Sequence, residues 1–137
     1  MSVPETRLTV PLRWRDMDML GHLNQAVYHE LLEEARGALI ATLAGEGERH
    51  QTYVLARVEL DYRHEVRKSD GTVDVIVRVG RVGTKSITLD HDVLLPDGTL
   101  AATGITVLVG WDAQARCARE ITAAERESLT GAAAHDG

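Results

Sequence analysis

A single stretch of this chain, from Asn24 to Leu43, has the period of an α-helix. Its apolar side chains recur every three or four residues, at Tyr28, Leu32, Ala35, Leu39 and Leu43. That spacing gives a helix one apolar face, while charged residues cover its other faces. Asn24 is a residue type that caps helix N-termini, and we expect the cluster Gly45-Glu46-Gly47-Glu48 to end the helix. Any fold for this chain must therefore place one long helix among strands.

Five other segments alternate apolar and polar residues, as half-buried strands do. One precedes the helix, with Leu8, Val10, Leu12 and Trp14 as its apolar members, and four follow at 54–62, 73–79, 87–95 and 100–109. The turn Pro96-Asp97-Gly98 joins the last two strands as a hairpin. This order predicts an α+β fold in which one helix lies across a five-stranded antiparallel sheet.

No internal repeat or linker divides the chain, so we expect residues 1–130 to form one domain and residues 131–137 a disordered tail. The run Thr122-Ala123-Ala124-Glu125 has the form of a capping box and predicts a short final helix. One helix covers only one face of a sheet. The other face and the edges would stay partly apolar, so we expect the chain to form oligomers.

Composition narrows the classes of function. The formal net charge of −6 argues against nucleic-acid binding. The single Cys117 cannot form an internal disulfide, which fits a reducing compartment. The first six residues lack the features of a signal peptide, and no apolar stretch is long enough to span a membrane. We therefore expect a cytoplasmic protein that binds neither nucleic acid nor membrane.

The segment between the first strand and the helix carries the most chemistry. It contains two carboxylates, Asp16 and Asp18, followed by Gly21 and the helix start. An acid there lies beside free backbone N–H groups at the positive end of the helix dipole. Such N–H groups can bind a carbonyl oxygen, while the carboxylate acts as a nucleophile or a general base. If Asn24 caps the helix through the N–H of Ala26 or Val27, the N–H of Gln25 stays free for a substrate oxygen.

The same segment resembles the signature of a known family. Its pattern is Asp-x-Asp-x-x-Gly-His-x-Asn-x-x-x-Tyr followed by Glu-Glu-Ala-Arg, filled by Asp16, Asp18, Gly21, His22, Asn24, Tyr28, Glu33, Glu34, Ala35 and Arg36. This pattern is similar to that of the 4-hydroxybenzoyl-CoA thioesterase-like group of hotdog proteins. A later run, Gly83-Thr84-Lys85-Ser86, falls where that family has a Gly-x-x-Ser stretch. In place of the second Asn that is frequent in the family, this chain has Gln25.

The resemblance implies a hotdog fold, with a long central helix packed on a five-stranded antiparallel sheet, and an activity. The substrate would be an acyl-CoA thioester, hydrolysed to a free acid and CoA, with no cofactor beyond the CoA of the substrate itself. Asp18 would be the catalytic carboxylate, and the backbone N–H of Gln25 would hold the oxyanion. Family members are homodimers or homotetramers with active sites at subunit interfaces, so we expect the same assembly here.

Contacts to the rest of the substrate are less constrained by the sequence. We take His22, Asn24, Arg81, Lys85 and Ser86 as the candidate substrate-binding residues. The cations Arg63, Arg67, Lys68, Arg81 and Lys85 form a pool for the phosphates of CoA, although a solvated strand surface also explains them. Asp16 is interpreted as structural, and Glu33 is kept as a reserve catalytic acid.

Other functions remain open to different degrees. A thioesterase for acyl-carrier proteins and a non-catalytic acyl-CoA-binding module both fit the same residues. A hotdog hydratase fits poorly, because the Asn-Pro segment expected between its Asp and its His is missing here. No metal site is predicted, since the sequence His29-Glu30-Leu31-Leu32-Glu33 lacks the second His of a zinc metalloprotease helix.

Overall fold

The structure is a computed structural model that describes residues 4–44 and 52–131. Its elements follow the chain as β1 (Glu5–Pro11), α1 (Gln25–Ala44), β2 (Thr52–Tyr62), β3 (Thr72–Val82), β4 (Ser86–Leu94), β5 (Leu100–Asp112), β6 (Cys117–Ala118) and α2 (Ala123–Thr130), with short 3-10 helices η1 (Trp14–Asp16) and η3 (Lys68–Asp70). The predicted α+β class is confirmed. Within the described ranges, no helix is both long and apolar enough to cross a membrane.

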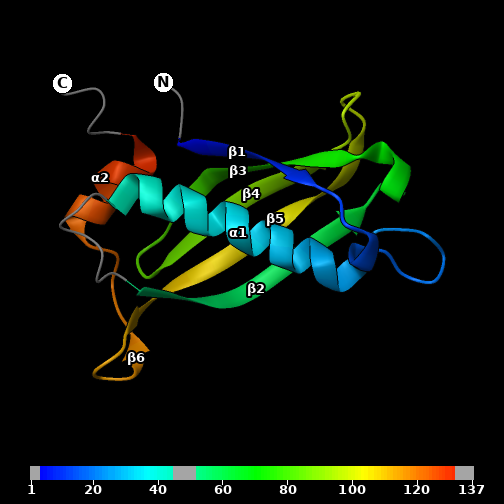
Figure 1. Cartoon of the computed structure of the whole chain (residues 1–137). Helices are drawn as coiled ribbons and strands as arrows, with labels where there is room; N and C mark the ends of the chain where they lie inside the picture. The colour runs from blue at the N-terminus through cyan, green and yellow to red at the C-terminus, as the bar shows by residue number, and fades with distance from the viewer. Residues whose placement is uncertain (1–3, 45–51, 132–137) are drawn as a thin grey trace.

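One antiparallel sheet contains all the strands. Its order is β1-β3-β4-β5-β2, and β6 pairs with β5. The sheet curls, and α1 runs across one of its faces, as Figure 1 shows. The two-residue β6 was not predicted, because so short a segment carries no alternation of its own. Pro11 ends the edge strand β1, where its missing N–H breaks no ladder.

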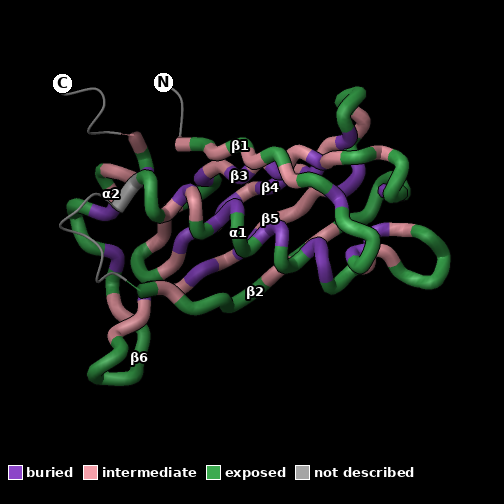
Figure 2. Tube along the Cα trace, in the orientation of Figure 1, coloured by how far each residue is buried: buried purple, intermediate pink, exposed green. Residues whose placement is uncertain are grey.

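The core lies between α1 and the inner face of the sheet (Figure 2). From α1 it takes the predicted apolar stripe as far as Leu39, and from β3 and β4 it takes alternate residues: Tyr28, Leu32, Ala35, Leu39, Val73, Val75, Val77, Val79, Ile87, Leu89 and Val93 are all buried. Each large aliphatic side chain buried in this way contributes about 1.5–3 kcal/mol. The apolar face of the helix packs here against the apolar face of the strands, and this packing fixes the orientation of α1 on the sheet. The side chain of Leu43, the last predicted member of the stripe, lies outside what the structure describes.

The alternation in β2 predicted a strand but overstated its burial. Val54 and Tyr62 are exposed. Two features explain this difference. The pairing with β5 shifts register between Leu55 and Arg57, and β2 lies at the edge of the sheet. A register shift of one residue reverses which side chains face the core, so Val54 before the shift lies on the opposite face from Val58 and Leu60 after it, while Tyr62 is exposed at the end of the edge strand.

The predicted capping residue of the short final helix is found in the structure. Thr122 accepts the N–H of Glu125 at 3.1 Å, and Glu125 accepts the N–H of Thr122 at 2.7 Å, which confirms the capping box of α2. The cluster at 45–48, expected to end the long helix, lies outside the described residues. So does the expected disordered tail at 131–137, apart from Gly131.

A polar group interrupts the apolar core beneath α1. His91 of β4, only 1% exposed, has its Nε2 2.7 Å from the hydroxyl of Thr106 on β5. Arg36 of α1 reaches the same hydroxyl at 3.4 Å. His91 Nδ1 has no hydrogen-bond partner among the described residues. Burial and then the nearby charge of Arg36 lower the pKa of His91 to about 4.

This burial predicts a loss of stability in mild acid. The unfolded chain binds a proton at His91 near pH 6.5, whereas the folded chain holds the pKa at about 4, so acid favours unfolding between these values. We expect His91 to remove about 2 kcal/mol of stability between pH 7 and pH 5. Urea unfolding of the wild type and of His91→Gln at both pH values measures the difference. An identical pH dependence in the two proteins would contradict a buried neutral His91.

Candidate active site

A tight loop holds the Asp18 side chain by one oxygen. Oδ1 accepts the backbone N–H of Leu20 at 2.9 Å and that of His22 at 3.1 Å. The N–H of Asp18 also donates to the carbonyl of His22 at 2.8 Å. Gly21 has φ of 79°, a conformation that side chains other than glycine rarely adopt. The carboxylate is therefore oriented through Oδ1, while Oδ2 accepts no hydrogen bond from the part of the chain that the structure describes.

Asp16, two residues earlier, anchors the loop. It is 3% exposed, and its carboxylate pairs with the Arg13 guanidinium at 2.8 Å and accepts the Arg13 N–H at 2.9 Å. Burial opposes ionisation, but the hydrogen bonds and charge of Arg13 hold the pKa of Asp16 below its usual value. Its carbonyl accepts the N–H of Asn24 at 2.9 Å. This geometry agrees with the structural interpretation of Asp16.

Asn24 caps α1 in the predicted way. Its Oδ1 accepts the N–H of Ala26 at 2.9 Å, and its carbonyl accepts the N–H of Val27 at 2.9 Å. The N–H of Gln25 donates to no described residue. A free N–H at the first position of a helix adds the helix dipole to its own hydrogen-bonding capacity. Asp18 and Gln25 line one cavity of about 570 Å³.

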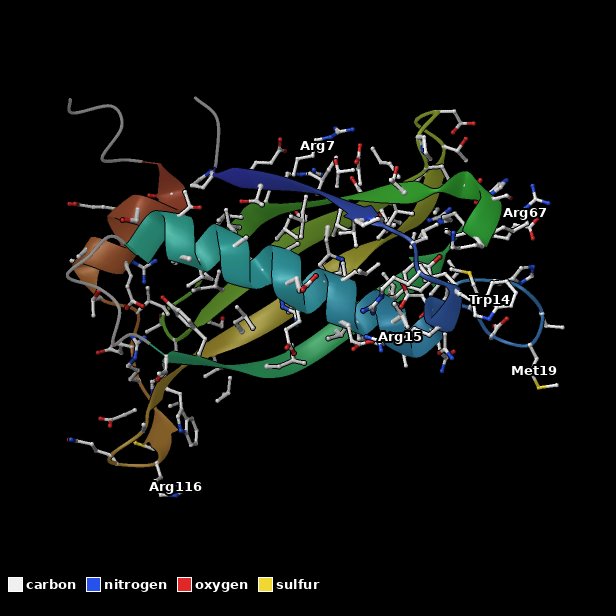
Figure 3. The ribbon with its side chains drawn as sticks, in the orientation of Figure 1. Arg7, Trp14, Arg15, Met19, Arg67 and Arg116 are labelled. Atoms are coloured by element: carbon white, nitrogen blue, oxygen red, sulfur yellow. The ribbon has the colours of Figure 1, made fainter. Side chains whose placement is uncertain are left out.

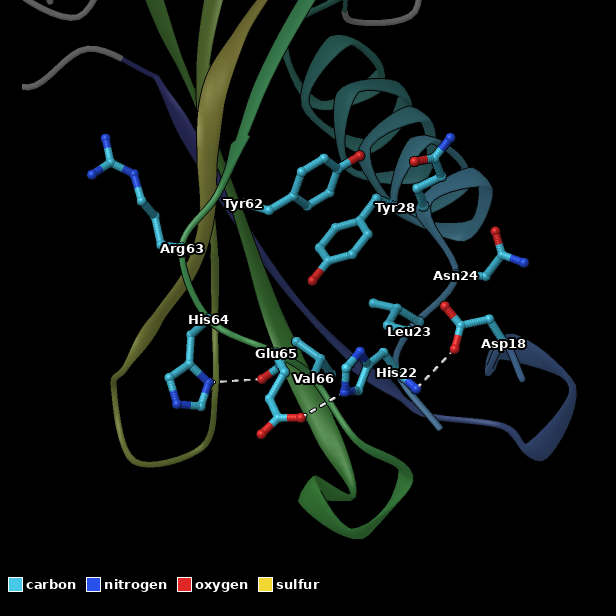
Figure 4. A pocket seen from close by; sticks show the side chains of 11 residues that line it. Asp18, His22, Leu23, Asn24, Tyr28, Tyr62, Arg63, His64, Glu65 and Val66 are labelled. Carbon is cyan, nitrogen blue, oxygen red and sulfur yellow. Dashed lines mark hydrogen bonds and ion pairs between the residues drawn. The ribbon is translucent and has the colours of Figure 1, made fainter. Parts of the chain in front are cut away.

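The opposite wall of this cavity comes from the end of β2 and the residues after it. Leu23 donates its N–H to the carbonyl of Val66 at 2.7 Å, which joins the Asp18 loop to this segment. His22 Nε2 lies 2.7 Å from an oxygen of Glu65 (Figure 4). Tyr28 and Tyr62 meet edge to face, with ring centroids 5.0 Å apart. Burial raises the pKa of Tyr28 to about 12, so its hydroxyl stays neutral at physiological pH.

Sequence reasoning placed only Arg63 of this second wall among the candidates. It missed Tyr62, His64, Glu65 and Val66, all of which line the cavity. No sequence pattern identified these residues, because 63–68 is a charged run in which apolar and polar residues do not alternate regularly. The pairing that places it, between 22–23 and 66–67, joins segments far apart in sequence.

A second hollow, of about 340 Å³, lies on the other side of Asp18. Trp14, Met17, Asp18, Met19, Gly21 and Lys68 line it. Trp14 is 82% exposed, and Met19 extends from the loop into solvent (Figure 3). Asp18 therefore stands between two spaces, one polar and aromatic and the other largely apolar.

The predicted site residues divide between the two ends of the sheet. Asp18, His22, Asn24 and Gln25 come together, as expected. In one chain, however, Arg81, Lys85 and Ser86 lie at the other end, around the β3–β4 hairpin beside α2. There Arg126 of α2 donates to the hairpin carbonyls of Val82 and Gly83. Within one chain, antiparallel strands carry 81–86 away from the helix start, so a role of Arg81, Lys85 and Ser86 in the same site as Asp18 stays a prediction.

The remaining candidates can also be placed. Glu33, the reserve acid, lines a separate hollow with Arg13 and Arg15, and Asp18 is not part of it. Lys68 lines the smaller hollow beside Asp18, and Arg67 pairs with His22 through the backbone. As for metals, residues 4–44 and 52–131 bring no three His, Cys, Asp or Glu side chains together in a group that could hold an ion.

Comparison with known proteins gives consistent matches. The family model described as the thioesterase-like superfamily matches residues 12–129. A thioesterase from Thermus thermophilus, solved with coenzyme A and Zn, is 31% identical over 93% of this chain and 98% of its own, with a TM-score of 0.81. The PA2801 protein of Pseudomonas aeruginosa is 27% identical over 94% and 100% of the two chains, with a TM-score of 0.81. No curated protein sequence matches the chain.

A more distant structure shares the fold alone. DHNA-CoA thioesterase from Staphylococcus aureus is 16% identical, covers 96% of this chain and 93% of its own, and has a TM-score of 0.81.

Proposed function

The chain belongs to the thioesterase-like superfamily and is a thioester hydrolase of the hotdog fold, and from this premise we propose that it hydrolyses acyl-CoA with Asp18 as the catalytic carboxylate. One observation carries the proposal: Asp18 lines the same cavity as Gln25, whose N–H donates to no described residue. The Thermus thermophilus thioesterase with coenzyme A bound supports CoA as the leaving group.

The proposed chemistry begins with the thioester carbonyl at the start of α1. Its oxygen accepts the Gln25 N–H, which stabilises the negative charge that develops during attack. Asp18 is held through Oδ1 by two backbone N–H groups, so Oδ2 faces the carbonyl carbon or a water beside it. Because the donors are already in place, little reorganisation accompanies the reaction.

Two routes use this geometry. In the covalent route, Oδ2 attacks the carbonyl carbon, the C–S bond breaks to release CoA thiolate, and water then hydrolyses the acyl-aspartate. In the other route, Asp18 takes a proton from water while the water oxygen attacks. The C–S bond then breaks, and the proton passes to the departing thiolate. Both routes give a free acid and CoA, and neither needs a further cofactor.

The divided site is the reason to propose a homodimer or homotetramer. We propose that α1 acts as the central helix of a hotdog fold and that copies pair antiparallel along the exposed edge of β2. Val54 and Leu55 are exposed on this edge. Such pairing reverses one sheet relative to the other, so a second copy carries Arg81, Lys85 and Ser86 to the end where Asp18 lies. These residues would then contact the CoA portion of the substrate.

An acyl-carrier protein is the second candidate for the acyl donor. Exposed Trp14, Met19 and Leu20 surround the Asp18 loop, and Arg15 is exposed beside them. An apolar surface with neighbouring cations suits an acidic protein partner. Acyl-CoA and an acylated carrier protein both present a thioester group to Asp18. A cytoplasmic location remains a prediction, based on the single, free Cys117.

The carboxylate is tested with Asp18→Asn and Asp18→Ala on a panel of acyl-CoAs and an acyl-carrier protein. We expect kcat to fall by about 10²–10⁴-fold in both, because each removes the group that attacks or takes the proton. Asp97→Asn is the matched control, since Asp97 also accepts the N–H two residues on, at 2.9 Å, but in the β4–β5 turn. Undiminished turnover in both Asp18 variants would contradict the assignment.

The oxyanion donor is tested with Gln25→Pro against Gln25→Ala. Proline lacks the backbone N–H and is favoured at the first helical position, while alanine keeps the N–H. The residue before it is pushed to an extended conformation, which suits an N-cap. We expect kcat of the proline variant to fall by about 10²–10³-fold relative to the alanine variant, with similar thermal unfolding. Equal kcat values would place the oxyanion elsewhere.

A further inference from the structure

Glu65 places a second carboxylate in the cavity beside Asp18, and its nearest partner is an imidazole. Its Oε1 lies 2.7 Å from His22 Nε2, and both side chains are partly exposed, at 43% and 42%. The backbone holds the pair together, because the Leu23 N–H donates to Val66 and His22 forms a bridge with Arg67. Glu65 and His22 therefore face each other as a consequence of how the loop is attached to the end of β2.

We infer that Glu65 is a positioning residue that makes His22 a hydrogen-bond acceptor for the pantetheine amide of the substrate. The inference rests on the proposed function and concerns how CoA is held, not how the C–S bond breaks. An ionised carboxylate only accepts hydrogen bonds, so it holds the proton of a neutral imidazole on Nε2. The other ring nitrogen, Nδ1, then presents a lone pair.

The lone pair points into the cavity. Nδ1 of His22 has no hydrogen-bond partner among the described residues, and Figure 4 shows it turned towards the space enclosed by Leu23 and Tyr28. His22 is also tied to Asp18, whose Oδ1 accepts its backbone N–H at 3.1 Å. This contact therefore fixes His22, which carries the Nδ1 acceptor, close to the Asp18 carboxylate that is proposed to act on the thioester.

The substrate offers one hydrogen-bond donor close to the reacting carbon. A CoA thioester has no N–H at the acyl carbon, and its first N–H is the pantetheine amide, two methylene groups beyond the sulfur. The Gln25 N–H serves the thioester carbonyl, so the amide N–H needs an acceptor nearby.

The pair could instead serve only to join the loop to β2, and the choice of substrate separates the two roles. Three thioesters of one acid are compared: the CoA ester, the N-acetylcysteamine ester, which keeps the amide, and the ethyl thioester, which has none. Glu65→Met removes the acceptor at similar length, Glu65→Gln retains an amide oxygen that can still accept, and Glu127→Met on the exposed face of α2 is the control.

We expect Glu65→Met to raise KM about tenfold for the two esters with an amide, with kcat within about twofold and no change on the ethyl thioester. Glu65→Gln should recover most of the affinity, and Glu127→Met should match the wild type. Equal losses on all three esters, or none on any, would overturn the inference while leaving the hydrolysis intact. Wild-type inactivity on all three would overturn the proposed function as well.

A second readout does not depend on turnover. Nitrogen-15 NMR of the histidine rings, assigned with His22→Ala, reports which ring nitrogen carries the proton. We expect the proton of His22 on Nε2 in the wild type and a shift towards the Nδ1-protonated form in folded Glu65→Met. A proton already on Nδ1 in the wild type would overturn the inference.

Discussion

Hydrogen bonds of Asn24 hold the start of α1 against the loop that carries Asp18. Its N–H donates to Asp16, its side chain accepts from Ala26, and its carbonyl accepts from Val27. An N-cap of this kind is worth about 0.5–2 kcal/mol. Its larger effect is geometric, because it uses the Ala26 and Val27 amides and leaves that of Gln25 pointing out of the helix. The candidate site includes Gln25, whose N–H donates to no described residue.

Environment separates the two acids of the loop. Asp16 is buried, and Arg13 holds it ionised as an anchor through its guanidinium and its backbone N–H. Asp18 is exposed between two hollows and keeps one oxygen free of backbone donors from the described part of the chain. Two carboxylates two residues apart thus take different tasks, one structural and one proposed to be chemical. The anchor fixes the orientation of the loop that carries the second acid.

Local chemistry explains which parts of the molecule the sequence could predict. Asp18, His22, Asn24 and Gln25 lie within eight residues, so helix capping and turn rules place them together. Periodicity likewise predicted α1 and the five long strands. The wall that carries Tyr62 and Glu65 depends on pairing between 22–23 and 66–67, which no local pattern encodes. The buried contact of His91 with Thr106 depends on strand register in the same way.

The division of Arg81, Lys85 and Ser86 from Asp18 is a matter of topology. Motif spacing identifies segments but not the end of the sheet at which each segment lies. Antiparallel β3 and β4 return these residues to the end that holds α2. The proposed pairing of two copies along the β2 edge would bring these residues to the end of the sheet where Asp18 lies.

The most direct measurement is a crystal structure of the protein with an acyl-CoA ketone, in which a methylene group replaces the thioester sulfur and hydrolysis is blocked. If Asp18 and Gln25 act as proposed, the ketone oxygen lies about 3 Å from the Gln25 nitrogen, and Asp18 Oδ2 faces the carbonyl carbon directly or through one water. A ketone bound away from the start of α1, with Asp18 touching neither it nor such a water, would contradict the proposed site.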